Sequence, residues 1–142
     1  MIQRIQTIWL FLAAIAGFFL TKLPLYEGST GAVLPVTYTA TESLLLFALT
    51  IVAALLAFVS IFLFKNRKQQ MRFSLLGILL SIILTGLVVY MFDSFKTAHP
   101  GFTKSSYSWG ALLPLAMIIF FIMAWNNMRK DEKLIKSLDR LR

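Results

Sequence analysis

The sequence contains no cysteine and a single histidine, and both facts narrow the chemistry available to it. Without cysteine the chain has no disulfide, no thiol nucleophile and no thiolate metal site. The histidine, His99, has no second histidine or cluster of acids at ligand spacing, so we predict no metal site. No glycine-rich phosphate loop is present, and the serines around Ser105 have no base nearby in the sequence. We therefore expect no catalytic residue, no cofactor and no enzymatic activity.

Charge is also scarce: charged residues make up 14% of the 142 residues, against about 25% in a typical soluble domain. Hydrophobic residues make up 58% and fall in four blocks, none with a charge near its middle. Lipid is the solvent that such a pattern indicates. We predict an all-α membrane protein, a four-transmembrane-helix bundle forming one integral membrane domain over residues 1–142. Its helices are expected at about residues 5–22, 42–64, 72–92 and 110–128.

The first apolar block admits two interpretations. From Ile5 to Leu20 it would span only about 24 Å as a helix, short of a ~30 Å hydrocarbon core, although Lys22 can reach the interface with its long side chain. The alternative is a secretory signal peptide, because the start is basic and Ala14 and Ala16 are small. A cleavage site should follow the apolar run, whereas these alanines lie inside it. We therefore interpret the block as a membrane helix.

The basic residues orient the predicted helices. Eleven of the fourteen lysines and arginines fall at Arg4, in a basic turn at residues 65–72 and in the tail, all on one side of the layout. The other side has three lysines. Because positive charge stays in the cytoplasm, both termini should be cytoplasmic. These residues flank apolar spans instead of alternating with exposed aromatics, so we expect no nucleic acid. They can bind anionic lipid headgroups, although orientation alone also explains them.

The two connections on the opposite side are longer. Residues 23–41 contain a turn signal at residues 28–31, followed by a stretch rich in Val, Thr and Tyr. This pattern fits either a β-hairpin or an irregular loop. Parts of the second connection, residues 93–108, can also be extended and pair with the first. We therefore expect a small outer cap, either β-paired or irregular.

A face of small residues lies on the third predicted helix. Gly77, Ser81 and Thr85 are four residues apart, and such spacing lets helices approach closely in lipid. The face can serve packing within the chain, binding of a partner, or the lining of a solute path. Glu42 and Asp93, at outer helix ends, are either ordinary helix-end acids or a pair that binds a cation or relays protons.

The tail, residues 129–142, has six basic and three acidic residues. Four apolar residues recur at three- and four-residue spacing and so share one helical face: Leu134, Ile135, Leu138 and Leu141. We predict a separate amphipathic cytoplasmic helix here, lying on the membrane surface or against the inner helix ends. Its apolar face is a candidate contact for a partner.

Three segments carry a resemblance to a known family. Residues 3–7, 110–114 and 129–142 resemble domain-of-unknown-function family 4293, which consists of small four-pass bacterial membrane proteins. The similarity covers the whole chain, and the tail is its most specific part. The resemblance implies a bacterial inner-membrane setting. It supplies no activity and no site residues.

Three hypotheses about function remain. The leading one is a non-enzymatic accessory or scaffold subunit that binds another membrane protein or its own copy, because mid-span charge is absent and the tail is distinctive. The alternative is an oligomeric channel or small-solute transporter with Gly77, Ser81 and Thr85 along the path. The third is a lipid-modifying enzyme, which would require His99, Glu42 and Asp93 to converge.

Overall fold

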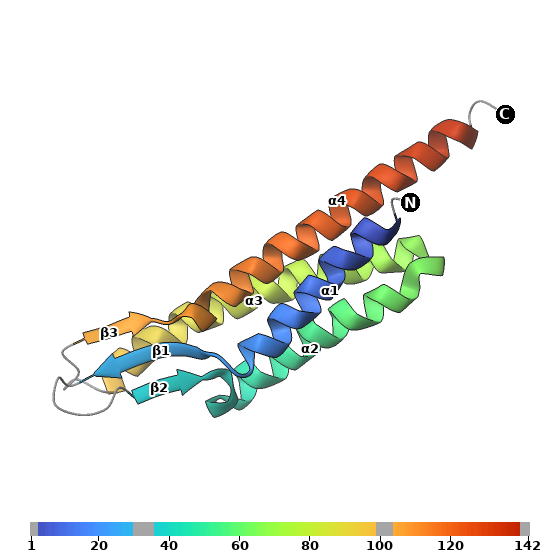
Figure 1. Cartoon of the computed structure of the whole chain (residues 1–142). Coiled ribbons are helices and arrows are strands. Elements are labelled where there is room, and N and C mark those ends of the chain that lie inside the picture. The colour runs from blue at the N-terminus through green and yellow to red at the C-terminus, as the bar shows by residue number, and fades with distance from the viewer. Residues whose placement is uncertain (1–2, 30–35, 99–103, 140–142) are drawn as a thin grey trace.

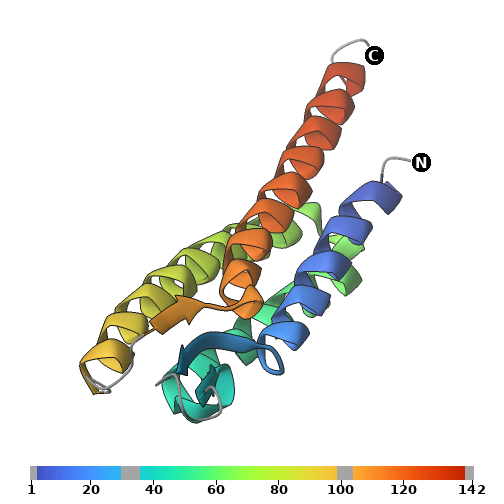
Figure 2. The same ribbon diagram turned by 60° about the vertical axis from the view of Figure 1, so that its left-hand side comes forward.

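Four helices lie side by side, with a small β-sheet at one end (Figure 1). The structure is a computed structural model, and it describes residues 3–29, 36–98 and 104–139. The helices are α1 (Gln3–Leu20), α2 (Leu44–Phe62), α3 (Arg67–Ala98) and α4 (Leu113–Asp139). Short 3-10 turns precede or follow them: η1 (Ala40–Glu42), η2 (Leu63–Lys65) and η3 (Trp109–Leu112). The start of α1, the α2–α3 turn and the end of α4 share the end opposite the sheet (Figures 1 and 2).

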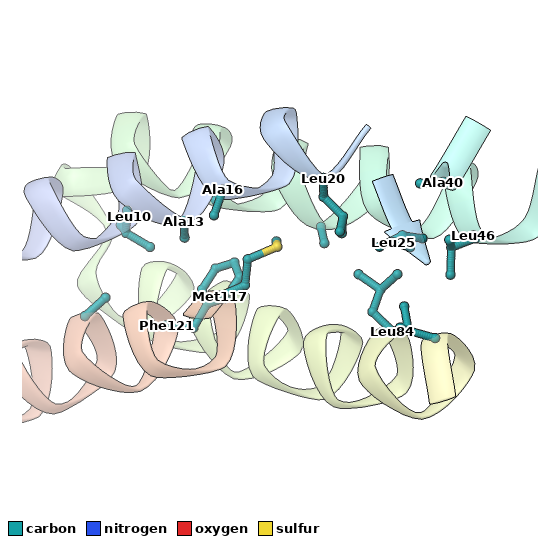
Figure 3. Packing of buried hydrophobic residues seen from close by; sticks show 14 of the residues in the cluster. Leu10, Ala13, Ala16, Leu20, Leu25, Ala40, Leu46, Leu84, Met117 and Phe121 are labelled. Atoms are coloured by element: carbon teal, nitrogen blue, oxygen red, sulfur yellow. The ribbon is translucent and has the colours of Figure 1, made fainter. Parts of the chain in front are cut away.

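Each helix packs against two others, which gives the cyclic order α1–α2–α3–α4. The reason lies in the spacing of the buried residues, which alternates between four and three. The buried positions are Leu46, Thr50, Ala53, Ala57 and Ser60 in α2, and Met117, Phe121, Ala124, Met128 and Asp131 in α4. An average spacing of 3.5 residues keeps one stripe of a helix facing its neighbours along its length. In Figure 3, Leu10 and Ala13 of α1 face Met117 and Phe121 of α4 across this core.

Small residues in these stripes bring the backbones close together. A Cβ added at Gly17 would lie 2.8 Å from the Cβ of Ala54, and one added at Gly77 would collide with the ring of Phe121. Close approach of this kind is how helices associate where water supplies no hydrophobic force. Most of the seryl and threonyl hydroxyls in these stripes bond back to their own helices, as Thr50 does to the carbonyl of Leu46 at 2.8 Å, whereas the hydroxyl of Ser74 donates to the sulfur of Met128 in α4 at 3.9 Å.

A three-stranded antiparallel sheet covers the ends of the helices. Its strands are β1 (Pro24–Ser29), β2 (Val36–Thr39) and β3 (Lys104–Tyr107), in the order β2-β1-β3. Tyr26 in the central strand lies opposite Tyr38 on one side and Tyr107 on the other. Of the two alternatives, a β-paired cap and an irregular one, the structure shows the β-paired one, with the second connection paired to the first. Residues 30–35, which hold part of the expected turn signal, lie outside the described residues.

Tyr26 fastens this sheet to the helices. Its side chain is 0% exposed, and its hydroxyl donates to the carbonyl of Val88 in α3 at 2.6 Å. The ring lies against Phe92 and Phe95 of the same helix, with centroids 5.3 and 5.9 Å away. Burial first, and then Tyr38 and Tyr107, raise the pKa of the Tyr26 phenol above its ordinary value. The phenol therefore stays protonated and remains a donor.

The helix boundaries differ from those expected at the charged segments. The prediction that residues 65–72 form a turn is wrong, because α3 begins at Arg67 and only η2 and Asn66 separate it from α2. Helix α3 also continues past residue 92 to Ala98. Hydropathy marks where lipid contact ends, whereas Arg, Lys and Gln are good helix formers outside lipid. Smaller differences occur in α1, which ends at Leu20, and in α2, which starts at Leu44 with Ser43 as its N-cap.

The prediction of a separate surface helix at residues 129–142 is also wrong for the described part of the tail. Helix α4 runs without a break from Leu113 to Asp139 (Figures 1 and 2). No glycine or proline follows Pro114 to interrupt it. The side chain of Arg129 also lies over the ring of Trp125, 4.4 Å from its centroid, and ties the first charged turn to the apolar part.

Three helical stretches are long and apolar enough to cross a membrane: Leu44–Phe62, Arg67–Ala98 and Trp109–Ile135. The apolar part of α1, Ile5–Leu20, is shorter. Because α1 packs along both α2 and α4, it lies alongside the three longer helices as a member of the same bundle.

Candidate functional site

A groove of about 670 Å³ lies near the sheet. Its walls are part of α3, the η3 turn, the first turn of α4, and strands β1 and β3. In Figure 2, β3 lies between α3 and the start of α4. The apolar lining consists of Val88, Val89, Ala111, Leu112 and Leu115. A volume of this size is typical of small-molecule sites.

Polar groups gather at the end of the groove nearest the sheet. Glu27, in the central strand, accepts a hydrogen bond from the hydroxyl of Ser108 at 2.8 Å. The amide of Ser108 in turn donates to the carbonyl of Leu25 at 2.9 Å, which fixes this serine beside β1. Tyr107 and Trp109 flank the same end. The groove is thus apolar along its length, with a carboxylate and two aromatic rings at one end.

The predicted small-residue face is divided between the interior and the groove. Gly77 and Ser81 are buried, and Gly77 lies directly under the ring of Phe121 of α4. Thr85 is half-buried and lines the groove. The hydroxyls of Ser81 and Thr85 bond to the carbonyls of Gly77 and Ser81 at 2.7 and 2.8 Å. Two of the three residues therefore pack within this chain.

A buried polar contact at the other end was not anticipated from the sequence. Asp131 of α4 is only 6% exposed and accepts a hydrogen bond from the side-chain amide of Gln6 in α1. Its second carboxylate oxygen, Oδ1, is buried and has no hydrogen-bond partner. The signal that could have revealed Asp131 is the four-three spacing of the buried stripe, which continues from Met128 to this residue.

Basic side chains from two helices meet near this contact. Lys68 and Arg72 of α3 and Arg129 of α4 line one hollow, together with Trp125 and Glu132. The charge pattern of the sequence predicts that these residues share one end of the layout, and the structure brings them to one hollow. Such a surface offers several donors to phosphate oxygens of lipid headgroups.

The tail residues singled out in the sequence fall on the projecting end of α4. Leu134 and Ile135 are 53% and 42% exposed. This end extends beyond the start of α1 and beyond the α2–α3 turn (Figures 1 and 2). Leu138 is helical, but its side chain lies outside the described part of the structure, as does the whole of Leu141.

Acids and histidine do not gather into a metal site within residues 3–29, 36–98 and 104–139, where no group of three or more potential ligands occurs. Glu42 is exposed and accepts from the backbone amide of Thr39 at 3.2 Å, as part of a capping box. Asp93 is exposed on α3. His99 lies outside the described residues.

A family model of small proteins, described as a domain of unknown function (DUF4293), matches residues 2–141. The chain belongs to the DUF4293 family. The resemblance noted in three segments is thus confirmed over nearly the whole DUF4293 chain, and the family description assigns no activity to it. No curated protein and no solved structure matches the chain.

Proposed function

We propose that this DUF4293 protein is a four-span protein of the bacterial inner membrane, with both termini in the cytoplasm. We further propose that it is a non-enzymatic accessory subunit that binds another membrane protein through the projecting end of α4. The observation that carries the second proposal is the exposure of Leu134 and Ile135 on a helix that extends past its neighbours.

The membrane placement is supported by the exterior of the helices. Large apolar side chains such as Leu55, Leu79 and Ile119 are 54–58% exposed, which is expected where lipid is the solvent. Helix α1, with 18 residues, is about 27 Å long, and Lys22 beyond its end is exposed and can reach the interface. The short α1 is thus compatible with a span.

The orientation is supported by the uneven distribution of charge between the two ends. The segments of the sheet end hold three lysines and three acids, whereas the other eleven basic residues fall in the sequence at Arg4, in residues 65–72 and in residues 129–142. Reporter fusions at Ser29 and at the C-terminus test it. A fusion at residue 29 should report a periplasmic position and a C-terminal fusion a cytoplasmic one. The reverse pair of results would contradict the proposal.

Partner binding is tested by affinity purification of the tagged chain in mild detergent, with mass spectrometry of the proteins that co-purify. Deleting residues 129–142 is too blunt, since it also removes Asp131 from its contact with Gln6. We therefore choose the double change Leu134→Ser, Ile135→Ser, which alters two exposed side chains. The matched control is Leu44→Ser, Leu45→Ser, at exposed positions on the opposite end of the molecule.

The tail variant should recover about tenfold less partner, the equivalent of ~1.4 kcal/mol, whereas the control should recover as much as the wild type. Equal recovery by both variants would exclude these residues as the contact. A wild-type chain that runs as a monomer without any enriched companion would contradict the proposal itself. A companion that proves to be a second copy would identify self-association.

The alternative, an oligomeric channel or transporter, receives less support from the burial pattern. Gly77 and Ser81 would have to leave the interior, where Gly77 lies against Phe121. Flux of ions or small metabolites in proteoliposomes tests this alternative, and the absence of flux counts against it.

Anionic lipids are a further proposed partner, at the hollow lined by Lys68, Arg72 and Arg129. Each such residue contributes about 1 kcal/mol near an anionic surface. A variant with all three changed to Gln should retain less phosphatidylglycerol on purification than the wild type does. Unchanged retention would leave orientation as the role of these charges.

A further inference from the structure

We propose that the outer groove binds a phospholipid with a primary-amine headgroup, with the ammonium against Glu27 and an acyl chain along Leu112, Leu115 and Val89. The inference rests on the proposed membrane placement, but it does not depend on the proposed protein partner.

The apolar lining of the groove determines the chemistry of the part of the ligand that lies along it. Five of its lining side chains are apolar, and it runs along α3 and α4, whose other outward residues we assign to lipid. A ligand that fills it from the membrane side must therefore present hydrocarbon to Val89, Leu112 and Leu115. An acyl chain meets this requirement, whereas a water-soluble amine does not.

The polar end of the groove determines the charge and the hydrogen-bonding groups that the headgroup must have. Glu27 is the only charged residue of the lining, and Lys96 and Lys104 do not take part in it. The ammonium of Lys96 lies over the ring of Phe92 instead, 4.4 Å from its centroid. The hydroxyl of Ser108 uses its hydrogen on Glu27, so both groups offer acceptor oxygens to an incoming ligand. A cationic headgroup with N–H donors complements this end, whereas a phosphate alone would be repelled.

Aromatic rings complete the headgroup end. Trp109 is 81% exposed and Tyr107 is 49% exposed, and both line the groove. Their rings sit at the level where interfacial aromatics meet headgroups, and each can place its face against an ammonium. Asp93 lies close enough to Tyr107 that, after burial, its negative charge is the next cause of the raised pKa of this phenol. Asp93 thus places a second carboxylate near the headgroup end, whereas the ammonium of Lys96 lies over Phe92, the ring next to Tyr107.

Native mass spectrometry of the full-length protein in mild detergent tests the proposal. The probes are phosphatidylethanolamine, phosphatidylglycerol and phosphatidylcholine with identical acyl chains. The wild type should bind phosphatidylethanolamine about tenfold more tightly than the other two, the size expected for a charge-assisted hydrogen bond. Choline is cationic but has no N–H, so its weaker binding separates hydrogen bonding from charge.

Two variants and one control locate the effect. Glu27→Gln should bind the three lipids equally, while Glu42→Gln, which removes an exposed acid outside the groove, should keep the preference. Thr85→Leu, which adds bulk to the lining, should weaken the binding of all three lipids without changing the ratio of their affinities. If Glu27→Gln fails to fold, the affinities of the wild type for the three lipids still test whether the groove prefers phosphatidylethanolamine.

Equal affinity of the wild type for the three lipids overturns the proposal, and so does a preference that survives in Glu27→Gln. A groove filled by a segment of another protein would appear as no retained phosphatidylethanolamine, which also overturns it. None of these variants changes Leu134 or Ile135. A negative result of the lipid-binding test therefore leaves the test of partner binding unaffected.

Discussion

The two ends of the helices are held together in different ways. At the sheet end, neutral hydrogen bonds and stacked aromatic rings join strands to helices around Tyr26. At the opposite end, the buried polar contacts include those of Gln6 with Asp131 and of Gln70 with the carbonyl of Ser60, and basic side chains such as Lys68 and Arg72 are exposed. One end of the molecule is thus held in a fixed geometry by internal contacts, whereas the other end exposes basic side chains and a helix surface that no other helix covers.

The largest expected effect is at the sheet end. Replacing Tyr26 with Ala removes a fully buried ring and its bond to Val88, and should lower the free energy of unfolding by ~3–5 kcal/mol. Tyr26→Phe should cost about 1 kcal/mol, the value of the hydrogen bond alone. Unfolding in detergent, followed by far-UV circular dichroism, measures both. The control is Tyr90→Ala, at a side chain that is 70% exposed, and an equal loss there would contradict the anchoring role.

The middle of the helices gives the next largest effect. Gly77→Val should destabilise the protein by ~1–3 kcal/mol or more, because the added carbons collide with the ring of Phe121. Gly86 lies on the same helix with nothing within 4 Å of an added Cβ, so Gly86→Val is the matched control. Thermal unfolding of the two variants should separate them clearly. Similar midpoints would mean that α3 and α4 can move apart at little cost.

At the basic end we expect a smaller effect. Gln6→Ala takes away the amide that donates to Asp131 and leaves a buried carboxylate without this donor, at a cost of about 1–3 kcal/mol. The exposed Gln69 offers a matched control as Gln69→Ala. Asp131→Asn, which keeps an acceptor oxygen, should be milder than Gln6→Ala. If Gln6→Ala proves as stable as the control, the contact between α1 and α4 contributes little.

The smallest expected effect is a loss of folding stability at alkaline pH, which arises from Tyr26 at the sheet end. The folded state raises the pKa of Tyr26 above 10, so it holds this proton more tightly than the unfolded chain does. Stability is therefore complete below pH 10 and falls as the pH rises above it. Tyrosinate absorbance and circular dichroism between pH 9 and 12 should show this loss, and Tyr26→Phe should reduce it. An unchanged profile in Tyr26→Phe would assign the loss to other groups.

Much of the helical layout could be predicted from the sequence, and the reasons for the rest are physical. Apolar runs located the cores of α2, α3 and α4, and the Val-, Thr- and Tyr-rich stretch made a hairpin one of two alternatives for the first connection. The boundaries of α3 were missed because the helix extends into polar segments where hydropathy carries no information. A continuous α4 follows from the helix-forming residues of the tail, which the change of charge at Arg129 obscured.

The candidate sites were harder to predict than the helices. Gln6 and Asp131 are 125 residues apart, so no local pattern connects them, although each continues the buried stripe of its own helix. The outer groove depends on where β3 crosses between α3 and α4, and the register of a strand is not visible in hydropathy. The basic hollow is intermediate: its basic residues could be assigned to one end of the helices, but the meeting of Lys68, Arg72 and Arg129 could not be predicted.

Pairing of β1 with β3 has a consequence for biogenesis. These strands come from opposite halves of the chain, and β3 emerges only just before the last helix. On the proposed membrane placement, the sheet can form only after both of its segments have been translocated, by which time the first three helices have been inserted. A ribosome-bound chain that has not yet released Tyr107 would leave one side of β1 without its partner strand.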